Sequence, residues 1–254
     1  MLLKDATILV VDDEADLREI QAAWFRREGC RVFIAGNGAE ALDVMRENHV
    51  DVLVSDVRMP VMDGIAMLKH VRASHDYKSS VMFISGFTDI EARDAYDLGV
   101  ESVMSKPVER KDLMVVVTRI VAARDELWRL PPGGKRGAIL DVIFDSLAAG
   151  LSQRLLVFGR GGFCILSTSK LPTGPVDLLL DFQADKRIVK GSGIIRWTAA
   201  PEPELGVEIT YIDDENRAWI LHLTEANASL SFIPRTTAIA ATASIAETHA
   251  STTA

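Results

Sequence analysis

The feature that most restricts the fold of this chain is a series of short apolar runs in its first half. These runs occupy residues 7–11, 31–35, 51–56, 80–85 and 102–105. A strand that is apolar at almost every position is typical of a parallel sheet covered on both faces. Between the runs, apolar residues recur at helical spacing. The helices predicted from this spacing cover residues 16–28, 39–47, 65–73, 90–99 and 109–130. The alternation predicts an α/β fold with a doubly wound sheet of five parallel strands.

Polar side chains stand where these strands end. They are Asp12 and Asp13 after the first strand, Asp56 at the third, Ser85 at the fourth and Lys106 after the fifth. Ligands bind outside the carboxyl ends of the strands in doubly wound sheets, so we expect these groups to converge. Neighbouring carboxylates repel one another, and a hard cation such as Mg²⁺ relieves that repulsion. With a hydroxyl and an ammonium group beside it, such a site has the parts needed to form an aspartyl phosphate.

The motifs at these strand ends resemble the receiver domain of bacterial two-component response regulators. They are VVDDE (10–14), SDVRMPVMDG (55–64), FISGF (83–87) and VMSKP (103–107). The resemblance covers residues 5 to about 128 and implies a flavodoxin-like fold. It also implies that a sensor histidine kinase phosphorylates the protein.

The resemblance implies a role for each polar group. Asp56 would be the phosphoacceptor, and Ser85 and Lys106 would bind the phosphoryl group. Mg²⁺ would be held by Asp13, Asp56, the backbone carbonyl of Arg58 and, through a bound water molecule, Asp12. The protein would then be a phosphoacceptor rather than an enzyme. Its own chemistry would be limited to Mg²⁺-dependent self-phosphorylation from small donors and self-dephosphorylation.

Three features of this half bear on signalling. Val103 stands where receivers usually carry an aromatic residue, three positions before Lys106, so an aromatic switch is not expected. Arg58 follows the phosphoacceptor by two positions, and we hypothesise that its side chain shields or pairs with the phosphoryl group; the alternative is a solvated loop charge. The last helix–strand–helix face, within residues 88–130, corresponds to one through which receivers dimerise. A homodimer is therefore expected there, although core packing explains most of its apolar residues.

The stretch LPPGG (130–134) predicts a domain boundary, because its prolines and glycines interrupt regular structure. We divide the chain into a receiver domain (1–130), a linker (131–135), a second domain (136–230) and a disordered tail rich in Ala, Thr and Ser (231–254). The second domain contains short β-prone runs at 154–158, 162–167, 176–182, 187–197 and 205–212. These runs predict a small antiparallel β-barrel, followed by a C-terminal helix over 213–223.

The second domain resembles the PilZ domain, a small β-barrel that binds cyclic di-GMP. The resemblance covers residues 136 to about 226 and is carried by segments 159–182, 188–198 and 204–220. PilZ domains use an RxxxR pair and a [D/N]xSxxG motif. In this chain the two glycines Gly161 and Gly162 are present, but Val157 and Gly159 occupy the acid and serine positions and no RxxxR precedes them.

These departures leave two functions open for the second domain. Arg154 and Arg160 are the candidate ligands for cyclic di-GMP, with Lys135 and Arg136 as the other nearby cations. Because the Val157 side chain cannot accept hydrogen bonds from guanine, a buried donor would be left unpaired. We therefore expect the domain to act through contact with an unknown protein target or through self-association. A cyclic di-GMP effector that integrates both signals is the alternative.

Composition restricts partners and location. The net charge of −8 disfavours nucleic acid as a partner, and hence a transcription regulator as the third alternative. Cys30 and Cys164 are far apart and have no metal-type spacing, which is typical of free thiols in a reducing compartment. No signal peptide or membrane-length apolar stretch is apparent, so we expect no membrane partner and a cytoplasmic location.

Overall fold

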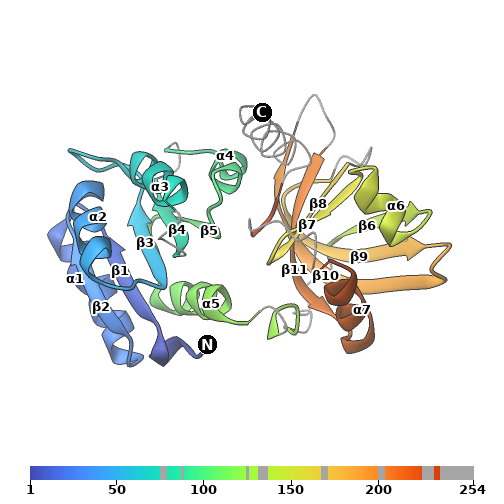
Figure 1. Cartoon of the computed structure of the whole chain (residues 1–254), viewed down its shortest axis with the longest axis horizontal. Coiled ribbons are helices and arrows are strands. Elements are labelled where there is room, and N and C mark those ends of the chain that lie inside the picture. The colour runs from blue at the N-terminus through green and yellow to red at the C-terminus, as the bar shows by residue number, and fades with distance from the viewer. Residues whose placement is uncertain are drawn as a thin grey trace, which may run out of the picture. The chain divides into compact units, whose positions relative to one another are not determined.

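In a computed structural model the chain forms two units, Met1–Arg124 and Asp125–Ala254, each built on its own sheet (Figure 1). The structure describes residues 1–74, 79–86, 89–123, 126–130, 137–166, 171–199, 204–224 and 232–234. Within these ranges, every helix is too short or too polar to span a lipid bilayer.

The first unit contains a five-stranded sheet in the order β2-β1-β3-β4-β5. The strands are β1 (Thr7–Val11), β2 (Arg31–Ala35), β3 (Val52–Asp56), β4 (Ser80–Ser85) and β5 (Ser102–Ser105). All four strand pairings are parallel. The strand order reverses beside β1, which is the switch point of a doubly wound sheet. The prediction of a five-stranded, doubly wound parallel sheet is confirmed.

Helices cover both faces of this sheet. They are α1 (Ala15–Arg27), α2 (Gly38–Glu47), α3 (Gly64–Ala73), α4 (Ala92–Asp97) and α5 (Arg110–Val121), after a short 3-10 helix, η1 (Leu3–Asp5). Alternate residues of β1 enter two separate cores. Ile8 packs in the core that holds Phe25 of α1 and Val117 of α5. Leu9 packs in the other core, with Met67 of α3. Burial on both faces explains why the strands are apolar at every position.

The end of the first unit differs from the prediction. Helix α5 ends at Val121, whereas the sequence predicts a helix as far as residue 130. Trp128 is buried and has a φ of 65°, which no helix accommodates. Arg129 forms a β-bridge with Tyr211, so this segment adds backbone pairing to the second unit. The apolar residues that predicted a longer helix, such as Trp128, instead pack in the core of the second unit.

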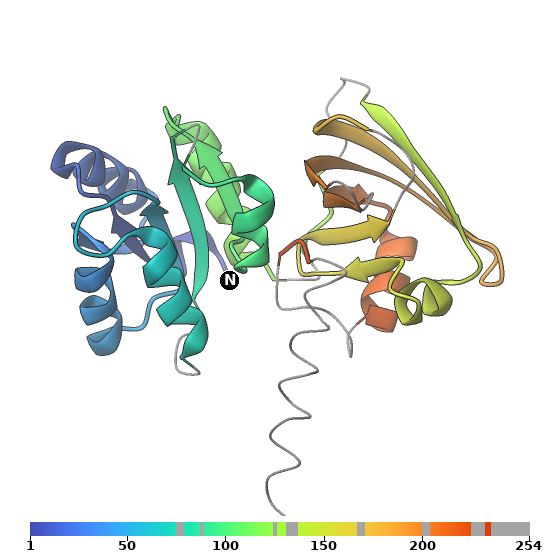
Figure 2. The same ribbon diagram turned by 90° about the horizontal axis from the view of Figure 1, so that it is seen from above.

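The second unit contains a six-stranded sheet in the order β6-β9-β10-β11-β8-β7. The strands are β6 (Ala138–Phe144), β7 (Leu156–Phe158), β8 (Gly162–Leu166), β9 (Gly174–Phe182), β10 (Arg187–Thr198) and β11 (Glu204–Ile212). Two helices accompany the sheet, α6 (Leu147–Ser152) and α7 (Asp214–Thr224). The strands curve strongly across the sheet (Figure 2).

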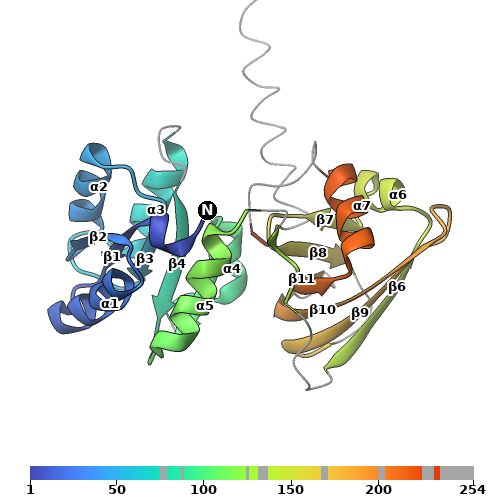
Figure 3. The same ribbon diagram turned by 90° about the horizontal axis from the view of Figure 1, so that it is seen from below.

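The predicted antiparallel β-barrel is not confirmed. Strands β6 and β9 pair in parallel, while the other pairings are antiparallel, so the sheet is mixed. Among the described residues, β6 and β7 are the two edge strands and no pairing joins them. The five strands that the sequence predicts here are all present, but β6 was not predicted (Figure 3).

Strand β6 escapes prediction because it is apolar on both faces. Leu140 and Phe144 are buried, whereas Ile139 and Ile143 are 65% and 63% exposed. The apolar–polar alternation that marks a half-buried strand is therefore hidden.

The beginning of the predicted disordered tail is packed. Phe232 and Ile233 are buried, and the backbone N–H of Gly161 donates a hydrogen bond to the Phe232 carbonyl at 2.9 Å. Residues 235–254 lie outside the described part of the chain.

Candidate functional site

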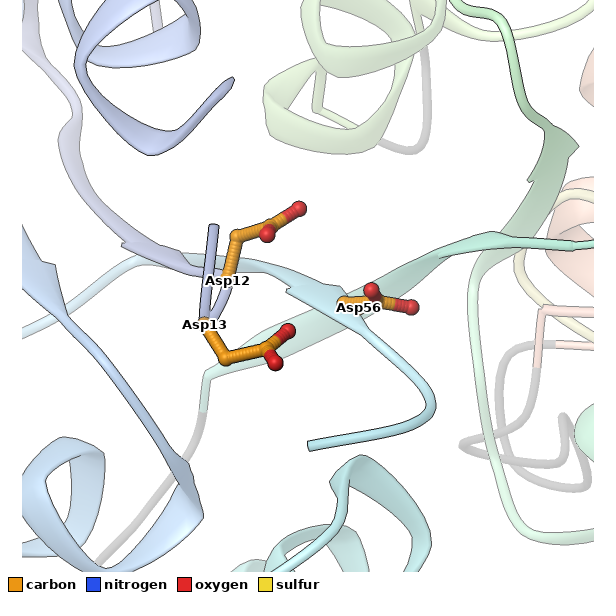
Figure 4. A group of neighbouring side chains, drawn as sticks. All are labelled: Asp12, Asp13 and Asp56. Atoms are coloured by element: carbon orange, nitrogen blue, oxygen red, sulfur yellow. The ribbon is translucent and has the colours of Figure 1, made fainter. Parts of the chain in front are cut away.

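Three carboxylates meet at the carboxyl edge of the first sheet. Each of Asp12, Asp13 and Asp56 places one carboxylate oxygen within 4.8 Å of the others (Figure 4). Asp12 and Asp13 follow β1, and Asp56 ends the neighbouring strand β3. Asp12 and Asp56 are buried, whereas Asp13 is exposed. The convergence predicted from the strand ends is present for these three residues.

The Asp56 side chain is fixed by hydrogen bonds to both of its oxygens. Its Oδ1 accepts from the backbone N–H of Val57 at 2.6 Å and of Arg58 at 3.3 Å. Its Oδ2 accepts from the Lys106 ammonium at 2.6 Å. The loop after β3 folds tightly here, because the Gly64 N–H donates to the Val57 carbonyl at 2.9 Å. A Cβ atom on Gly64 would lie 2.4 Å from the Asp56 carbonyl oxygen, so the loop requires glycine.

Lys106 joins two of the carboxylates. Its Nζ lies 2.6 Å from Asp56 Oδ2 and 3.3 Å from Asp12 Oδ2. Burial opposes the charged form of the amine, but the hydrogen bond to Asp56 and the charges of Asp56 and Asp12 outweigh it and raise the pKa of Lys106. Burial also raises the pKa of Asp12, although the Glu14 N–H and Lys106 act in the opposite direction. The ammonium group therefore stays protonated and balances part of the negative charge.

Ser85 lies beside this cluster on the next strand. The register pairs Asp56 with Ile84, and the Lys106 N–H donates to the Ser85 carbonyl at 2.9 Å. The Ser85 hydroxyl has two acceptors, the Gly86 carbonyl at 2.7 Å and Asp89 Oδ2 at 3.3 Å. Sheet pairing thus brings the predicted hydroxyl and ammonium groups to the same edge as the three carboxylates.

The Arg58 side chain does not pair with Asp56. Its Nε donates to Asp89 Oδ1, and the two groups form an ion pair. Burial works against ionisation of Asp89, but the hydrogen bond from Arg58 holds its pKa below the ordinary value. The Arg58 side chain is 66% exposed, so it is a largely solvated loop charge that also has an ion-pair partner.

Sequence reasoning missed two contributors to the site. Asp89 accepts from both Ser85 and Arg58, and the Arg18 guanidinium donates to the Asp12 carbonyl. Asp89 is a polar residue that closely follows the serine at the end of β4, and this position was the signal available. Arg18 faces back from α1, a direction that only the folded helix reveals.

The cluster has the chemistry of a Mg²⁺ site. Carboxylate oxygens and a backbone carbonyl are the ligands that hard divalent cations prefer. Two buried carboxylates and an exposed third, all within 4.8 Å, offer such oxygens on one side and access to solvent on the other. The residues present fit the ion.

The predicted dimer face is largely occupied by core packing. Leu113, Val117 and Ile120 of α5 are buried in the core of the first unit. Val121, the last residue of α5, belongs to that core too. On α5, Val115 is the large apolar side chain that is about half exposed. Val103 of β5 packs against the other core of this unit, the one that contains Leu9 and Met67.

In the second unit, the two predicted phosphate ligands have different surroundings. Arg154 is exposed and lines a cavity of about 410 Å³ whose other walls include Leu151, Val157 and Leu223. Arg160 does not line this cavity; its guanidinium lies over the Phe232 ring, 5.6 Å from the centroid. The cavity is mainly apolar, which is unlike a site for two phosphates.

Close packing explains the two glycines on which the expected PilZ resemblance partly rested. A Cβ on Gly161 would lie 2.0 Å from the Phe232 ring. A Cβ on Gly162 would lie 1.9 Å from the Val207 carbonyl oxygen of β11. Both glycines are therefore required by the fold itself, without any ligand.

Comparison with known proteins covers the first unit best. The family profile "Response regulator receiver domain" matches residues 8–118. "Regulatory protein AtoC" of Escherichia coli (strain K12) is 35% identical over 171 residues, which is 61% of this chain and 37% of that protein. "DNA-binding transcriptional regulator NtrC" of the same organism is 31% identical over 154 residues, 60% of this chain and 32% of that protein.

Among solved structures, chemotaxis response regulator CheY4 of Vibrio cholerae has 30% sequence identity and a TM-score of 0.43. It covers 46% of this chain and 98% of its own. The chain spans about a third of the length of the curated relatives it matches. The family match, together with the acidic cluster at the strand ends, identifies residues 8–118 as a response regulator receiver domain of two-component systems.

Proposed function

We propose that this protein is a response regulator phosphorylated on Asp56 by a sensor histidine kinase. The observation that carries the proposal is the arrangement around this carboxylate. Asp56 is buried beside two further carboxylates, and the Lys106 ammonium lies 2.6 Å from its Oδ2. A nucleophile, a set of oxygens for a cation and a fixed positive charge are the parts that phosphoryl transfer needs.

The chemistry follows from these positions. A carboxylate oxygen of Asp56 attacks the phosphorus of a phosphohistidine, a P–O bond forms, and the P–N bond breaks as its electron pair leaves with the imidazole. Lys106 and the Ser85 hydroxyl donate to the phosphoryl oxygens. Asp13, Asp56 and the Arg58 carbonyl, with Asp12 acting through water, would hold Mg²⁺, which would supply positive charge to neutralise the phosphoryl oxygens. Hydrolysis by water later releases phosphate and restores the carboxylate.

Phosphorylation with a small donor tests this assignment. Wild-type protein incubated with acetyl phosphate and Mg²⁺ should gain one phosphoryl group, detected by intact-protein mass spectrometry. Asp56→Asn should gain none, because the amide is not a nucleophile. Asp43→Asn, an exposed acid on α2 that pairs with Arg46, is the matched control and should label like wild type. Labelling of Asp56→Asn at the wild-type level would refute the assignment.

We further propose that the second unit acts by protein contact or self-association. Support comes from exposed apolar side chains on the edge strand β6, Ile139 and Ile143, and from Ile188 on β10, which is 53% exposed. The register aligns Ile143, Asp181 and Ile188 in one row across the three strands. Apolar groups at an open sheet edge are typical of interaction surfaces.

Light scattering coupled to size-exclusion chromatography tests self-association. The mass of the full chain is compared with and without beryllofluoride and Mg²⁺, which mimic phosphorylation. A change of mass that Ile139→Asp with Ile143→Asp removes supports self-association. A constant monomer moves the proposal to a different protein partner, which is then sought by comparing wild type with Asp56→Asn.

Two alternatives remain for the output. Cyclic di-GMP binding rests on Arg154 and the PilZ-like skeleton, and a calorimetric titration of cyclic di-GMP into the full chain tests it. Transcription control rests on relatives such as NtrC, whose name describes a DNA-binding regulator. A gel shift with genomic fragments tests that alternative. We place both behind protein contact, because the cavity at Arg154 is mainly apolar and the chain is acidic.

A further inference from the structure

Asp89 occupies a special place beside the phosphoacceptor. Its carboxylate is 7% exposed, with Oδ1 accepting from Arg58 Nε and Oδ2 lying 3.3 Å from the Ser85 hydroxyl. A Cβ on Gly86 would lie 2.7 Å from Asp89 Oδ2, so the glycine leaves room for this carboxylate. One anion thus contacts two groups, the hydroxyl at the end of β4 and the guanidinium in the loop after β3.

Both groups are close to Asp56. Arg58 is near it along the chain, and Ser85 is near it across the sheet. The Arg58 N–H donates to Asp56 Oδ1 at 3.3 Å, and Ser85 directly follows Ile84, the register partner of Asp56. A phosphoryl group on Asp56 is also an anion that seeks hydroxyl and guanidinium donors. A hydroxyl has a single proton, so donation to the phosphoryl group would end the donation of the Ser85 hydroxyl to the Gly86 carbonyl at 2.7 Å and to Asp89 Oδ2 at 3.3 Å.

We propose, on the basis of the function proposed above, that Asp89 is a positioning residue that competes with the phosphoryl group on Asp56 for the Ser85 hydroxyl and the Arg58 guanidinium. Before phosphorylation, Asp89 pairs with the Arg58 guanidinium and shares the Ser85 hydroxyl with the Gly86 carbonyl. After phosphorylation the donors turn to the new anion, and Asp89 is released from them. The segment that carries Asp89 then transmits the phosphorylation state of Asp56 to α4. Val103 is not aromatic and cannot transmit that state in the way that an aromatic residue would.

Beryllofluoride binding to the full chain, measured by calorimetry in excess Mg²⁺, tests the competition. Asp89→Asn keeps the size of the side chain but removes its charge, so it should bind beryllofluoride about three to ten times more tightly than wild type. Asp89→Glu, which keeps the charge, should stay closer to wild type. Asp63→Asn is the matched control, because Asp63 caps α3 through the Ala66 N–H and asparagine preserves that cap.

The dependence on Arg58 is the sharper readout. In wild type Arg58 must leave Asp89 to reach the phosphoryl mimic, so the lost contact offsets the new one and Arg58→Ala should weaken beryllofluoride binding only slightly. In the Asp89→Asn background Arg58 reaches the phosphoryl mimic without giving up this ion pair, and Arg58→Ala should remove most of the gain. Equal effects of Arg58→Ala in both backgrounds would overturn the proposal. So would unchanged binding by Asp89→Asn, with urea unfolding showing that each variant is folded.

Failure of the proposed function has a different signature. If Asp56 is not the phosphoacceptor, wild type binds no beryllofluoride, or Asp56→Asn binds it as well as wild type does. Either result overturns both proposals together. Saturable binding by wild type that Asp56→Asn abolishes, combined with additive effects of Arg58 and Asp89, overturns the competition alone.

Discussion

At the scale of single residues, the site depends on how closely the backbone can approach the phosphoacceptor. The loop after Asp56 returns to it at Gly64, where a Cβ atom would lie 2.4 Å from the Asp56 carbonyl oxygen. That atom belongs to the backbone, which cannot rotate away as a side chain could.

Gly64→Ala should therefore destabilise the receiver by about 1–3 kcal/mol through overpacking and should slow labelling by acetyl phosphate. Urea unfolding and mass spectrometry measure the two effects. Gly36→Ala is the control, because its Cβ would meet the flexible end of Glu40 at 3.3 Å. Its free energy of unfolding should change by less than about 0.5 kcal/mol. Equal losses for both variants would contradict the steric argument.

Lys106 sets the balance of charge at the same site. Lys106→Met removes the ammonium group that lies 2.6 Å from Asp56 and 3.3 Å from Asp12, so repulsion among the carboxylates increases. Added Mg²⁺ should then raise the melting temperature of the variant more than that of wild type. Lys111→Met, an exposed residue of α5, serves as the control. A smaller Mg²⁺ effect in Lys106→Met than in wild type would show that the ammonium group does not oppose the ion.

The position of a site residue in the sheet decides whether the sequence could predict it. Asp12, Asp56 and Ser85 stand at the ends of apolar strands, and parallel pairing brings such ends to one edge. The contact of Asp89 with Arg58 could not be predicted, because it joins two loops that carry no periodic pattern. Tertiary packing alone determines that contact.

At the scale of elements, the strands were easier to predict than their pairing. Apolar runs and turn residues located β7 to β11 within two residues or so, but nothing in those runs specifies which strand lies beside which. The parallel pairing of β6 with β9 depends on the connection through α6 and the strands that follow. Because Ile139 and Ile143 of the edge strand β6 are apolar but exposed, its sequence does not show which side chains face the core.

The start of α7 offers a test at this scale. Asp213 Oδ1 accepts from the Asn216 N–H at 3.0 Å, which is the arrangement of a helix N-cap. Burial opposes ionisation, but the hydrogen bonds from Asn216 lower the pKa of Asp213 below its ordinary value. The stabilisation is therefore complete above the unfolded pKa of about 3.9 and is lost as the pH falls through the lower folded value.

Asp213→Ala should cost about 1 kcal/mol at pH 7, and this cost should shrink in acid. Asp213→Asn keeps the cap without a titrating group, so it should lose less stability than the alanine variant at pH 7. Urea unfolding of the three proteins between pH 3 and pH 7 measures these differences. A cost for Asp213→Ala that is constant down to pH 3 would contradict the assigned role of the charge.

At the scale of the whole molecule, the chain divides where α5 has ended, between Arg124 and Asp125. Trp128 then belongs to the second unit: its Nε1 donates to the Gly161 carbonyl at 3.2 Å, and its ring lies 6.1 Å from that of Phe158. We expect the full chain to unfold in two calorimetric transitions. Beryllofluoride with Mg²⁺ should raise only the receiver transition, because ligand binding stabilises the unit that binds.

Trp128→Ala should reduce the free energy of unfolding of the second unit by about 3–5 kcal/mol, because it removes a buried aromatic side chain. It should therefore lower the temperature of the other transition only. Trp24→Ala, on α1 of the receiver, is the complementary control and should affect the ligand-sensitive transition. If Trp128→Ala lowered the ligand-sensitive transition instead, the segment after α5 would have to be assigned to the receiver.

Two segments of the second unit, one before β6 and one after α7, are hydrogen-bonded to the same residue. Gly161 accepts from the Trp128 indole through its carbonyl, and its own N–H donates to the Phe232 carbonyl. In mechanical terms, tension applied at Trp128 reaches Gly161 and also strand β11, through the bridge between Arg129 and Tyr211. Tension applied at Phe232 reaches strand β8 through Gly161, the residue that precedes it. The two ends of the described unit therefore load the six-stranded sheet at different strands, and the segment at Phe232 should detach before the one at Trp128.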